Sequence, residues 1–344
     1  MIKAKKYSSE IKCISVICML LVLYIHSCYS SNEFPNYNIL YWIQQVMAYY
    51  LGRLAVPTFF MLSGFLFYNN ILEKGLSYKL KTRFFTLVVP YLFGCSFFVA
   101  IMYILSLLCP STLNTAYLYI DLFNKNIIDI LKETYIISTS DKPLAFHLWF
   151  LRNLIVVVLT TSFIPIIPIK IRQLCLVLLL IIASFSDSTS IATSSFWFYL
   201  GGFISTRCKH LNISKKMAYV SAIFFIGLSF FEAFVHKLLI WQYLQIPIIF
   251  LGIVAFIYMC INFNVTFRNS LLHIAPYTFF IYLSHEPFIN IIRKLLPFIS
   301  GNNQMMVVLA YITTPILSIL LLICVAKTFK RFFPLAYSIY VGNR

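Results

Sequence analysis

Long apolar runs, separated by short polar segments, occupy most of the chain. Runs of this length match the roughly 20 residues that a helix needs to cross a bilayer. The pattern predicts an all-α, polytopic transmembrane helical bundle of about ten spans. The expected spans cover residues 11–29, 39–68, 84–108, 146–167, 173–185, 196–205, 217–235, 239–261, 274–292 and 305–326.

The second run, 39–68, is too long for one straight crossing. Gly52 and Pro57 within it predict a kink, or a tilted start that lies partly in the membrane interface. The basic stretch that follows, 74–83, is expected to be a loop.

Residues 110–145 form the longest polar stretch, and we expect them to be an extracytoplasmic loop. Apolar residues recur with helical spacing between Tyr117 and Ile137, which predicts a short amphipathic helix on the membrane surface. The sequence shows no internal repeat and no separate soluble domain, so residues 1–344 are expected to form a single membrane-embedded domain.

Composition agrees with lipid as the solvent. Hydrophobic residues make up 61% of the chain and charged residues 11%, against about 25% charged residues in soluble domains. The net charge of +17 could indicate nucleic-acid binding, but the basic residues lie in short clusters between apolar runs, as cytoplasmic loops do. We therefore expect an N-in, C-in topology and no nucleic-acid partner. Lys237, Arg293 and Lys294 are exceptions on the outer side.

Several common chemistries lack their sequence signatures. The nine cysteines show no C-x-x-C spacing and no His–Cys metal spacing, so we expect no disulfide and no metal. The sequence also lacks a G-x-S-x-G elbow, a phosphate-binding glycine-rich loop and H-E-x-x-H.

A few ionisable residues fall inside the predicted spans, where a charge costs about 3 kcal/mol on insertion scales. They are His26, Arg53, His147, Arg152, Glu232, His236, His285 and Glu286. His26 could serve as a general base on an acceptor hydroxyl, or be a histidine hydrogen-bonded at the headgroup level. Arg53 could meet a carboxylate, a phosphate or a water-filled cavity, or clamp a bent helix.

The other ionisable residues also allow more than one interpretation. Lys79, Lys81 and Arg83 could bind the phosphates of coenzyme A or be an ordinary positive flank. Arg152 lies about one helical turn deeper than the interfacial Trp149. Glu232 and His236 are four apart and could pair with each other in a structural role. His285 and Glu286 are adjacent and should point in different directions, which argues against their acting as one dyad.

Four segments give the chain a family resemblance. They are VLYIHS, ending at His26, then RLAVPTFFMLSGFLF from Arg53 to Phe67, a basic entry running into VVPY at Tyr91, and HLWFLRNL from His147 to Leu154. With these segments the chain resembles the acyltransferase 3 family, polytopic membrane O-acyltransferases that modify sugars of bacterial surface polysaccharides. The second segment is the most specific, and the resemblance extends over nearly the whole chain.

The resemblance implies an acyltransferase domain over 1–344, in the bacterial inner (cytoplasmic) membrane. It implies acyl-CoA, most simply acetyl-CoA, as donor, a glycan or lipid-linked sugar as acceptor, and no permanently bound cofactor. The site residues that we carry forward are catalytic His26, Arg53 and Arg152, donor-binding Lys79, Lys81 and Arg83, and substrate-binding His147, Trp149 and His285. Because His26 is expected near the outer face and the donor site near the inner one, either a cavity connects them or the acyl group moves across.

Two departures from the family pattern concern donor handling. Lys12 and Ser15 stand where relatives often have an Asp-x-x-Arg pair, and Arg83 is followed at the third position by Thr86 rather than by a second Arg. Two other functions stay open on the sequence. An exporter of a glycan or small solute would suit buried Arg and His equally, and a non-catalytic assembly subunit would suit the departures.

Overall fold

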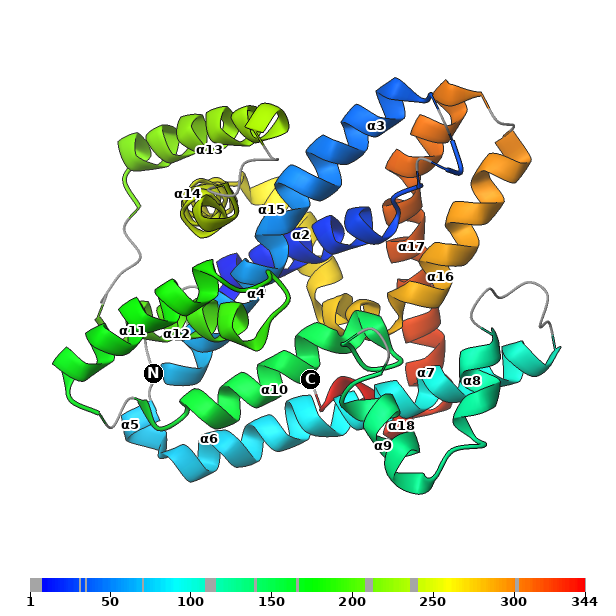
Figure 1. Ribbon diagram of the computed structural model, residues 1–344, viewed down its shortest axis with the longest axis horizontal. Coiled ribbons are helices and arrows are strands. Elements are labelled where there is room, and N and C mark those ends of the chain that lie inside the picture. The colour runs from blue at the N-terminus through cyan, green and yellow to red at the C-terminus, as the bar shows by residue number, and fades with distance from the viewer. Residues whose placement is uncertain are drawn as a thin grey trace. The chain divides into compact units, whose positions relative to one another are not determined.

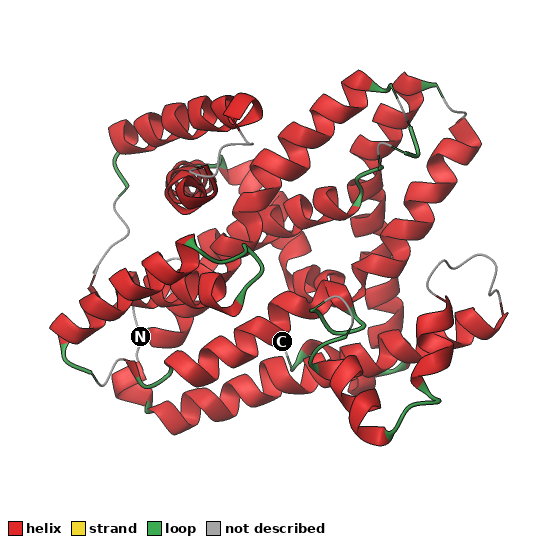
Figure 2. Cartoon of the chain, in the orientation of Figure 1, coloured by secondary structure: helices red, strands yellow, loops and turns green. Residues whose placement is uncertain are grey.

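The computed structural model describes residues 8–30, 32–34, 36–69, 71–108, 116–138, 141–164, 167–207, 213–235, 241–300 and 303–343. Every regular element in these ranges is a helix (Figure 2), which confirms the all-α class. Five helical segments in them are long and apolar enough to cross a membrane: Ser8–His26, Asn38–Tyr68, Leu76–Leu108, Tyr243–Ile261 and Gln304–Phe332. Each predicted span contains a helix, while the number of ten and the N-in, C-in orientation stay predictions.

The chain divides into two compact units. Unit 1 comprises Met1–Leu76 and Thr161–Lys327. Its helices are α2 (Ser8–His26), α3 (Asn38–Gln44), the π-helix η1 (Gln45–Leu51), the 3-10 turn η2 (Gly52–Leu54), α4 (Ala55–Tyr68), α5 (Ile71–Lys74), α11 (Ile169–Ser184), α12 (Ile191–Arg207), α13 (Lys215–Val235), α14 (Trp241–Ile261), α15 (Val265–Ile274), η7 (Ala275–Tyr277), α16 (Thr278–Ser300) and most of α17 (Gln304–Phe332).

Unit 2 comprises Ser77–Thr160 and Thr328–Arg344. It holds α6 (Leu76–Arg83), the π-helix η3 (Phe84–Val88), α7 (Val89–Leu108), α8 (Ala116–Leu122), α9 (Ile127–Tyr135), η5 (Phe146–Leu148), α10 (Trp149–Thr161) and α18 (Pro334–Val341). Helix α7 packs against α8, α9 and α18. The Tyr91 hydroxyl donates to the Tyr135 carbonyl at 2.6 Å, which ties α7 to the end of α9.

Helix α2 is the central element of unit 1, in contact with α4, α14, α15 and α16. Its N-terminal end is held by Arg268, whose guanidinium lies 3.7 Å from Glu10. Its C-terminal end is held by α17, because the Tyr24 hydroxyl donates to the Ile312 carbonyl at 3.2 Å and the Tyr24 and Tyr311 rings lie 5.7 Å apart. Anchoring at both ends fixes the position of any side chain that α2 carries.

Helices α4 and α12 lie side by side (Figure 1) and approach closely through glycine. A Cβ added at Gly64 would overlap the Phe198 carbonyl, and one at Gly201 would overlap the Met61 carbonyl. Small residues of this kind allow helix backbones to meet inside a membrane, where no hydrophobic force drives helices together. The contact fixes α4, and with it the segment that precedes α4.

That preceding segment is irregular, as the position of Gly52 predicts. From Asn38 to Tyr68 the chain stays helical, but it passes from α-helix through the π-helix η1 and the 3-10 turn η2 before α4 begins. Pro57 is the third residue of α4 and has no N–H to donate to the Arg53 carbonyl, so the hydrogen-bond ladder is interrupted at the junction of η2 and α4. The irregularity therefore lies at residues 45–54, N-terminal to the proline.

Four local predictions need correction. The basic stretch expected as a loop is helical, because Gly75, at φ 79°, ends α5 and α6 then continues into α7. The single amphipathic helix expected between Tyr117 and Ile137 is two helices, since Asn126 caps the start of α9. Helices α15 and α18 were not expected. Each is too short to be recognised as a membrane span.

Candidate functional site

His26 is the last residue of α2, and its side chain is 21% exposed. Two residues of α16 surround it, and we call the group of His26, His285 and Glu286 the His26 cluster. The His26 Nδ1 atom lies 2.9 Å from Glu286 Oε2. The His285 ring meets the His26 ring edge-on, with centroids 4.8 Å apart. Adjacent residues of one helix thus both reach the same imidazole, which corrects the expectation that they act apart.

Further contacts fix the orientation of the two α16 side chains. The Glu286 Oε1 atom accepts a hydrogen bond from the Asn290 amide at 2.9 Å. The His285 Nδ1 atom lies 2.7 Å from the Tyr282 carbonyl, an acceptor, so this nitrogen carries the proton. His285 is fully buried and Glu286 is 7% exposed. The cluster is therefore preorganised from the side of α16.

This arrangement suits acid–base chemistry. A carboxylate beside Nδ1 favours the ring tautomer that is protonated on that nitrogen, in which Nε2 can accept a proton. It also stabilises the imidazolium that forms after proton uptake. The same three side chains could also hold a metal ion, since one donor atom from each lies within 4.8 Å of the others. Two histidines and one carboxylate are a ligand set that zinc accepts.

The loop that follows His26 is anchored to the same helix. Arg293 lies two helical turns after Glu286 on α16, and its guanidinium donates to the Cys28 carbonyl. It also lies 5.7 Å from the centre of the Tyr29 ring and 3.7 Å from a Glu33 oxygen. Arg293, an exception to the positive-inside pattern, thus makes structural contacts with the loop after His26.

Arg53 occupies the 3-10 turn η2 and forms an ion pair with α13. Its Nη1 atom lies 2.6 Å from Glu232 Oε2, and Nη2 donates to the Ser229 hydroxyl at 3.0 Å. The Tyr49 hydroxyl donates to the other Glu232 oxygen at 3.3 Å. Side-chain exposures of 13% for Arg53 and 2% for Glu232 make this a buried pair.

These contacts match the alternative in which Arg53 clamps an irregular helix. Glu232 pairs with Arg53, and its expected partner His236 lies outside the described residues. The clamp lies close to the C-terminal end of α2, which carries His26, because Gly52 packs against the Ile25 side chain. A catalytic role for Arg53 stays a prediction.

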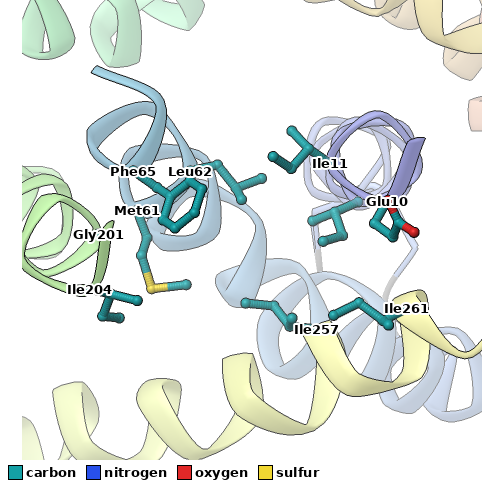
Figure 3. Close-up of a pocket in the computed structure, with 10 residues that line it drawn as sticks. Glu10, Ile11, Met61, Leu62, Phe65, Gly201, Ile204, Ile257 and Ile261 are labelled. Carbon is teal, nitrogen blue, oxygen red and sulfur yellow. The ribbon is translucent and has the colours of Figure 1, made fainter. Parts of the chain in front are cut away.

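The opposite half of α2 borders an apolar recess in unit 1 (Figure 3). Its walls are apolar side chains of α2, α4, α12 and α14, with Glu10 at one edge. Among the residues that line it, Glu10 is the one ionisable group. The recess therefore lacks the paired groups that acid–base chemistry needs, and we assign it no step.

In unit 2, Arg152 donates to protein acceptors from each of its nitrogens. Nη1 donates to the carbonyls of Ile136 at 2.8 Å and Asp141 at 3.0 Å, while Nε and Nη2 donate to the Asn153 side chain. These bonds hold the loop between α9 and η5 against α10. They do not support the predicted catalytic role of Arg152, which stays untested.

The residues predicted to bind substrate differ in accessibility. His147 is 3% exposed, and its ring packs edge-on against Phe98 at 4.9 Å. Trp149 begins α10, with the Lys142 ammonium 5.9 Å from its ring centre. His285 belongs to the His26 cluster. Direct substrate contact with His147 or His285 would thus require the surrounding packing to open, because both side chains are buried.

The predicted donor-binding residues all lie on α6. Because α6 is helical, Lys79 and Arg83, four residues apart, share one face, while Lys81 points away from it. Lys79 and Arg83 are half-buried, and Lys81 is exposed. Donor binding by all three residues stays a prediction, and the helix places Lys79 and Arg83 on a common face.

Neither a curated protein nor a solved structure matches the chain. A family model does: the acyltransferase domain of the acyltransferase 3 family matches residues 9–325 of the 344. The match includes the His26 cluster and the segments that carried the resemblance, and it agrees with the five membrane-length helices. The chain is a multi-pass membrane protein that belongs to the acyltransferase 3 family.

Proposed function

We propose that the protein transfers an acyl group, most simply acetyl, from acyl-CoA to a sugar hydroxyl of a surface polysaccharide or its lipid-linked precursor. The proposed location is the bacterial inner membrane. The observation that carries the proposal is the His26 Nδ1–Glu286 Oε2 distance of 2.9 Å. It supplies the oriented base that a hydroxyl acceptor requires.

In the proposed step, Nε2 of His26 removes the proton of the acceptor hydroxyl as its oxygen attacks the thioester carbonyl. The C–S bond breaks, and the departing thiolate takes the proton back from the imidazolium. A sugar ester and free coenzyme A result. Glu286 is a positioning residue in this scheme, because it holds Nδ1 and stabilises the transient positive charge.

A second route remains open, in which His26 first accepts the acyl group itself. The two routes differ in one observable. With radiolabelled acetyl-CoA and no acceptor, the second route leaves label on wild-type protein that is denatured rapidly in the cold at neutral pH, and none on His26→Ala. The direct route leaves both unlabelled.

On the donor side, we propose that Lys79 and Arg83 bind the phosphates of coenzyme A. Their shared face on α6 and their positive charge support this role. Roles for Arg53 or Arg152 at the carbonyl oxygen, or in orienting the sugar, stay predictions. Both side chains are engaged by protein acceptors.

The test compares wild type, His26→Ala and a matched control, His273→Ala, at equal protein levels. His273 is an exposed histidine near the end of α15. Loss of a general base lowers the rate by about 10²–10⁴-fold, so we expect base-labile acetate on the cell's glycans to disappear in His26→Ala and persist in His273→Ala. Wild-type acetylation by His26→Ala would exclude the proposed role.

The family assignment does not favour the exporter alternative. The discriminating measurement uses purified protein in vesicles. Release of coenzyme A from acetyl-CoA with ester formation identifies a transferase. Solute flux without acyl transfer identifies a carrier.

A further inference from the structure

A second hollow in unit 1 lies beside the C-terminal end of α2. It has a volume of about 530 Å³ and is open to the surroundings, between the loop after His26 and the helices α3 and η1. We call it the tyrosine–amide recess. Its tyrosine and glutamine side chains are Tyr29, Tyr37, Tyr41, Gln44, Gln45 and Tyr49, and the apolar Ile25, Phe34, Leu40 and Ala48 complete much of the lining.

The lining combines flat aromatic rings with neutral hydrogen-bonding groups. Tyrosine offers a ring face and a hydroxyl, and glutamine offers both a donor and an acceptor. None of the described residues that line the recess carries a charge. A phosphate or carboxylate ligand would call for Arg or Lys. The chemistry fits a neutral sugar, whose C–H faces pack on aromatic rings and whose hydroxyls pair with amides.

The orientation of α3 agrees with a ligand-binding wall. Tyr41 and Gln45 are four residues apart, so they share one face, and that face turns toward the recess. Tyr41 is 52% exposed and Gln45 is half-buried. A helix face turned toward lipid would carry apolar side chains instead of amides.

The backbone of this wall is also unusual. Gln45 to Leu51 form the π-helix η1. This geometry is rare in proteins overall, and where it occurs it is often at a functional site. The opposite wall is held rigid, because Gln44 bonds both the Tyr29 N–H, at 2.6 Å, and the Tyr29 carbonyl, at 3.3 Å. Arg293 fixes the same loop from α16. Such preorganisation lowers the cost of binding.

The recess lies next to the proposed catalytic residue. Ile25 and Cys28, on either side of His26 in the chain, both line it. A glycan acceptor carries several sugar units, so one unit can occupy the recess while its neighbour presents a hydroxyl to His26. We propose that the tyrosine–amide recess is the acceptor subsite and that it binds a neutral sugar unit; the inference rests on the proposed function.

The test uses the full chain, purified and reconstituted in nanodiscs. The acceptor probe is the envelope glycan of the native host, stripped of esters by mild alkali and separated into neutral and acidic fractions. Acyl transfer from acetyl-CoA is followed as coenzyme A release and as ester on the glycan. The variants are Tyr41→Ala and Gln45→Ala, and the control is Trp42→Ala, an equally exposed aromatic (54%) that does not line the recess.

We expect the neutral fraction to be the acceptor. Its KM should rise about tenfold or more in Tyr41→Ala and Gln45→Ala, the effect of losing one stacking or hydrogen-bonding contact of about 1.4 kcal/mol. The KM for acetyl-CoA should change less than twofold in both variants, and Trp42→Ala should keep the wild-type acceptor KM.

Three results would overturn the inference. The first is an unchanged acceptor KM in both recess variants, and the second is use of the acidic fraction alone. The third is an equal effect of Tyr41→Ala and Trp42→Ala on membrane insertion, with no change in acceptor KM. The last would show an interfacial anchor. Each leaves the proposed function standing as long as His26→Ala abolishes transfer. Wild-type transfer by His26→Ala would reject the proposed function whatever the recess variants do.

Discussion

Glu286 holds the Nδ1 atom of His26 at 2.9 Å, from a helix near the other end of the chain. Replacing this carboxylate with an amide removes the charge that stabilises an imidazolium, and allows the wrong ring tautomer. We expect Glu286→Gln to lower kcat for acyl transfer by about 10²-fold or more. Glu286→Asp should recover part of the activity and shift the pH–rate profile.

The control for this experiment is Glu73→Gln, which changes an exposed carboxylate of α5 in the same unit. The measurement is the pH–rate profile of coenzyme A release by purified protein. Equal activity of Glu286→Gln and wild type at every pH would show that the contact between Glu286 and His26 does not contribute to catalysis. A chelator tests whether the His26 cluster binds a metal ion. Loss of activity with EDTA and recovery with zinc would identify a metal site.

Arg53 and Glu232 should behave as a buried ion pair. Arg53→Ala leaves the Glu232 carboxylate, 2% exposed, without its main partner. Removal of one partner of such a pair costs about 3–5 kcal/mol. We expect a large fall in the midpoint of thermal unfolding in detergent, and recovery of most of it in the double variant Arg53→Met with Glu232→Leu.

The double variant also separates structure from chemistry. If Arg53 only stabilises the irregular helix, the double variant recovers acyl transfer together with stability. Full stability with no transfer would instead identify Arg53 as a residue that the reaction needs.

Donor binding should follow the face of α6. Lys79→Ala and Arg83→Ala should each raise the KM for acetyl-CoA about tenfold, because each removes a charged phosphate contact. Lys81→Ala, on the other face, should have less than a threefold effect. Acetyl-pantetheine lacks the nucleotide phosphates, so its KM should be insensitive to all three changes. Equal effects on both donors would contradict phosphate recognition.

Glycine packing between α4 and α12 predicts two positions that do not tolerate alanine, and an open glycine in α13 provides the control. Gly64→Ala and Gly201→Ala place a Cβ onto a backbone carbonyl of the facing helix, whereas a Cβ at Gly227 meets no atom within 4 Å. We expect the first two variants to fail to accumulate as folded protein. Gly227→Ala should match wild type, since alanine favours helix. Size-exclusion profiles of a fluorescent fusion report all three.

The sequence predicted the all-α membrane class and drew attention to His26, because hydropathy and an isolated ionisable residue in an apolar helix are local signals. It did not identify Glu286 as the partner of His26, since that contact joins distant parts of the chain. The reasoning that adjacent side chains diverge is correct for a lone helix. It failed here because α2 ends against α16 at a point that His285 and Glu286 both reach.

Other differences have similar causes. Charge density made 74–83 look like a loop, although Lys, Leu and Arg favour helix, and the glycine that breaks the helix lies at position 75. Arg53 was expected to meet a carboxylate or a cavity, but the sequence offered no way to choose Glu232 among the acidic residues. The tyrosine–amide recess depends on a π-helix, which hydrophobic periodicity cannot distinguish from an α-helix.

The glycine contact between α4 and α12 also restricts how the protein can move during turnover. Gly64 meets Phe198 while Gly201 meets Met61, so the two helices interlock at two points. Two points prevent sliding as well as rotation of α4. Displacement of the wall formed by η1 must then arise by flexing of residues 45–54, N-terminal to the interlock. Those residues already depart from the α-helical hydrogen-bonding pattern, so we expect any opening of the proposed acceptor recess to arise by their flexing.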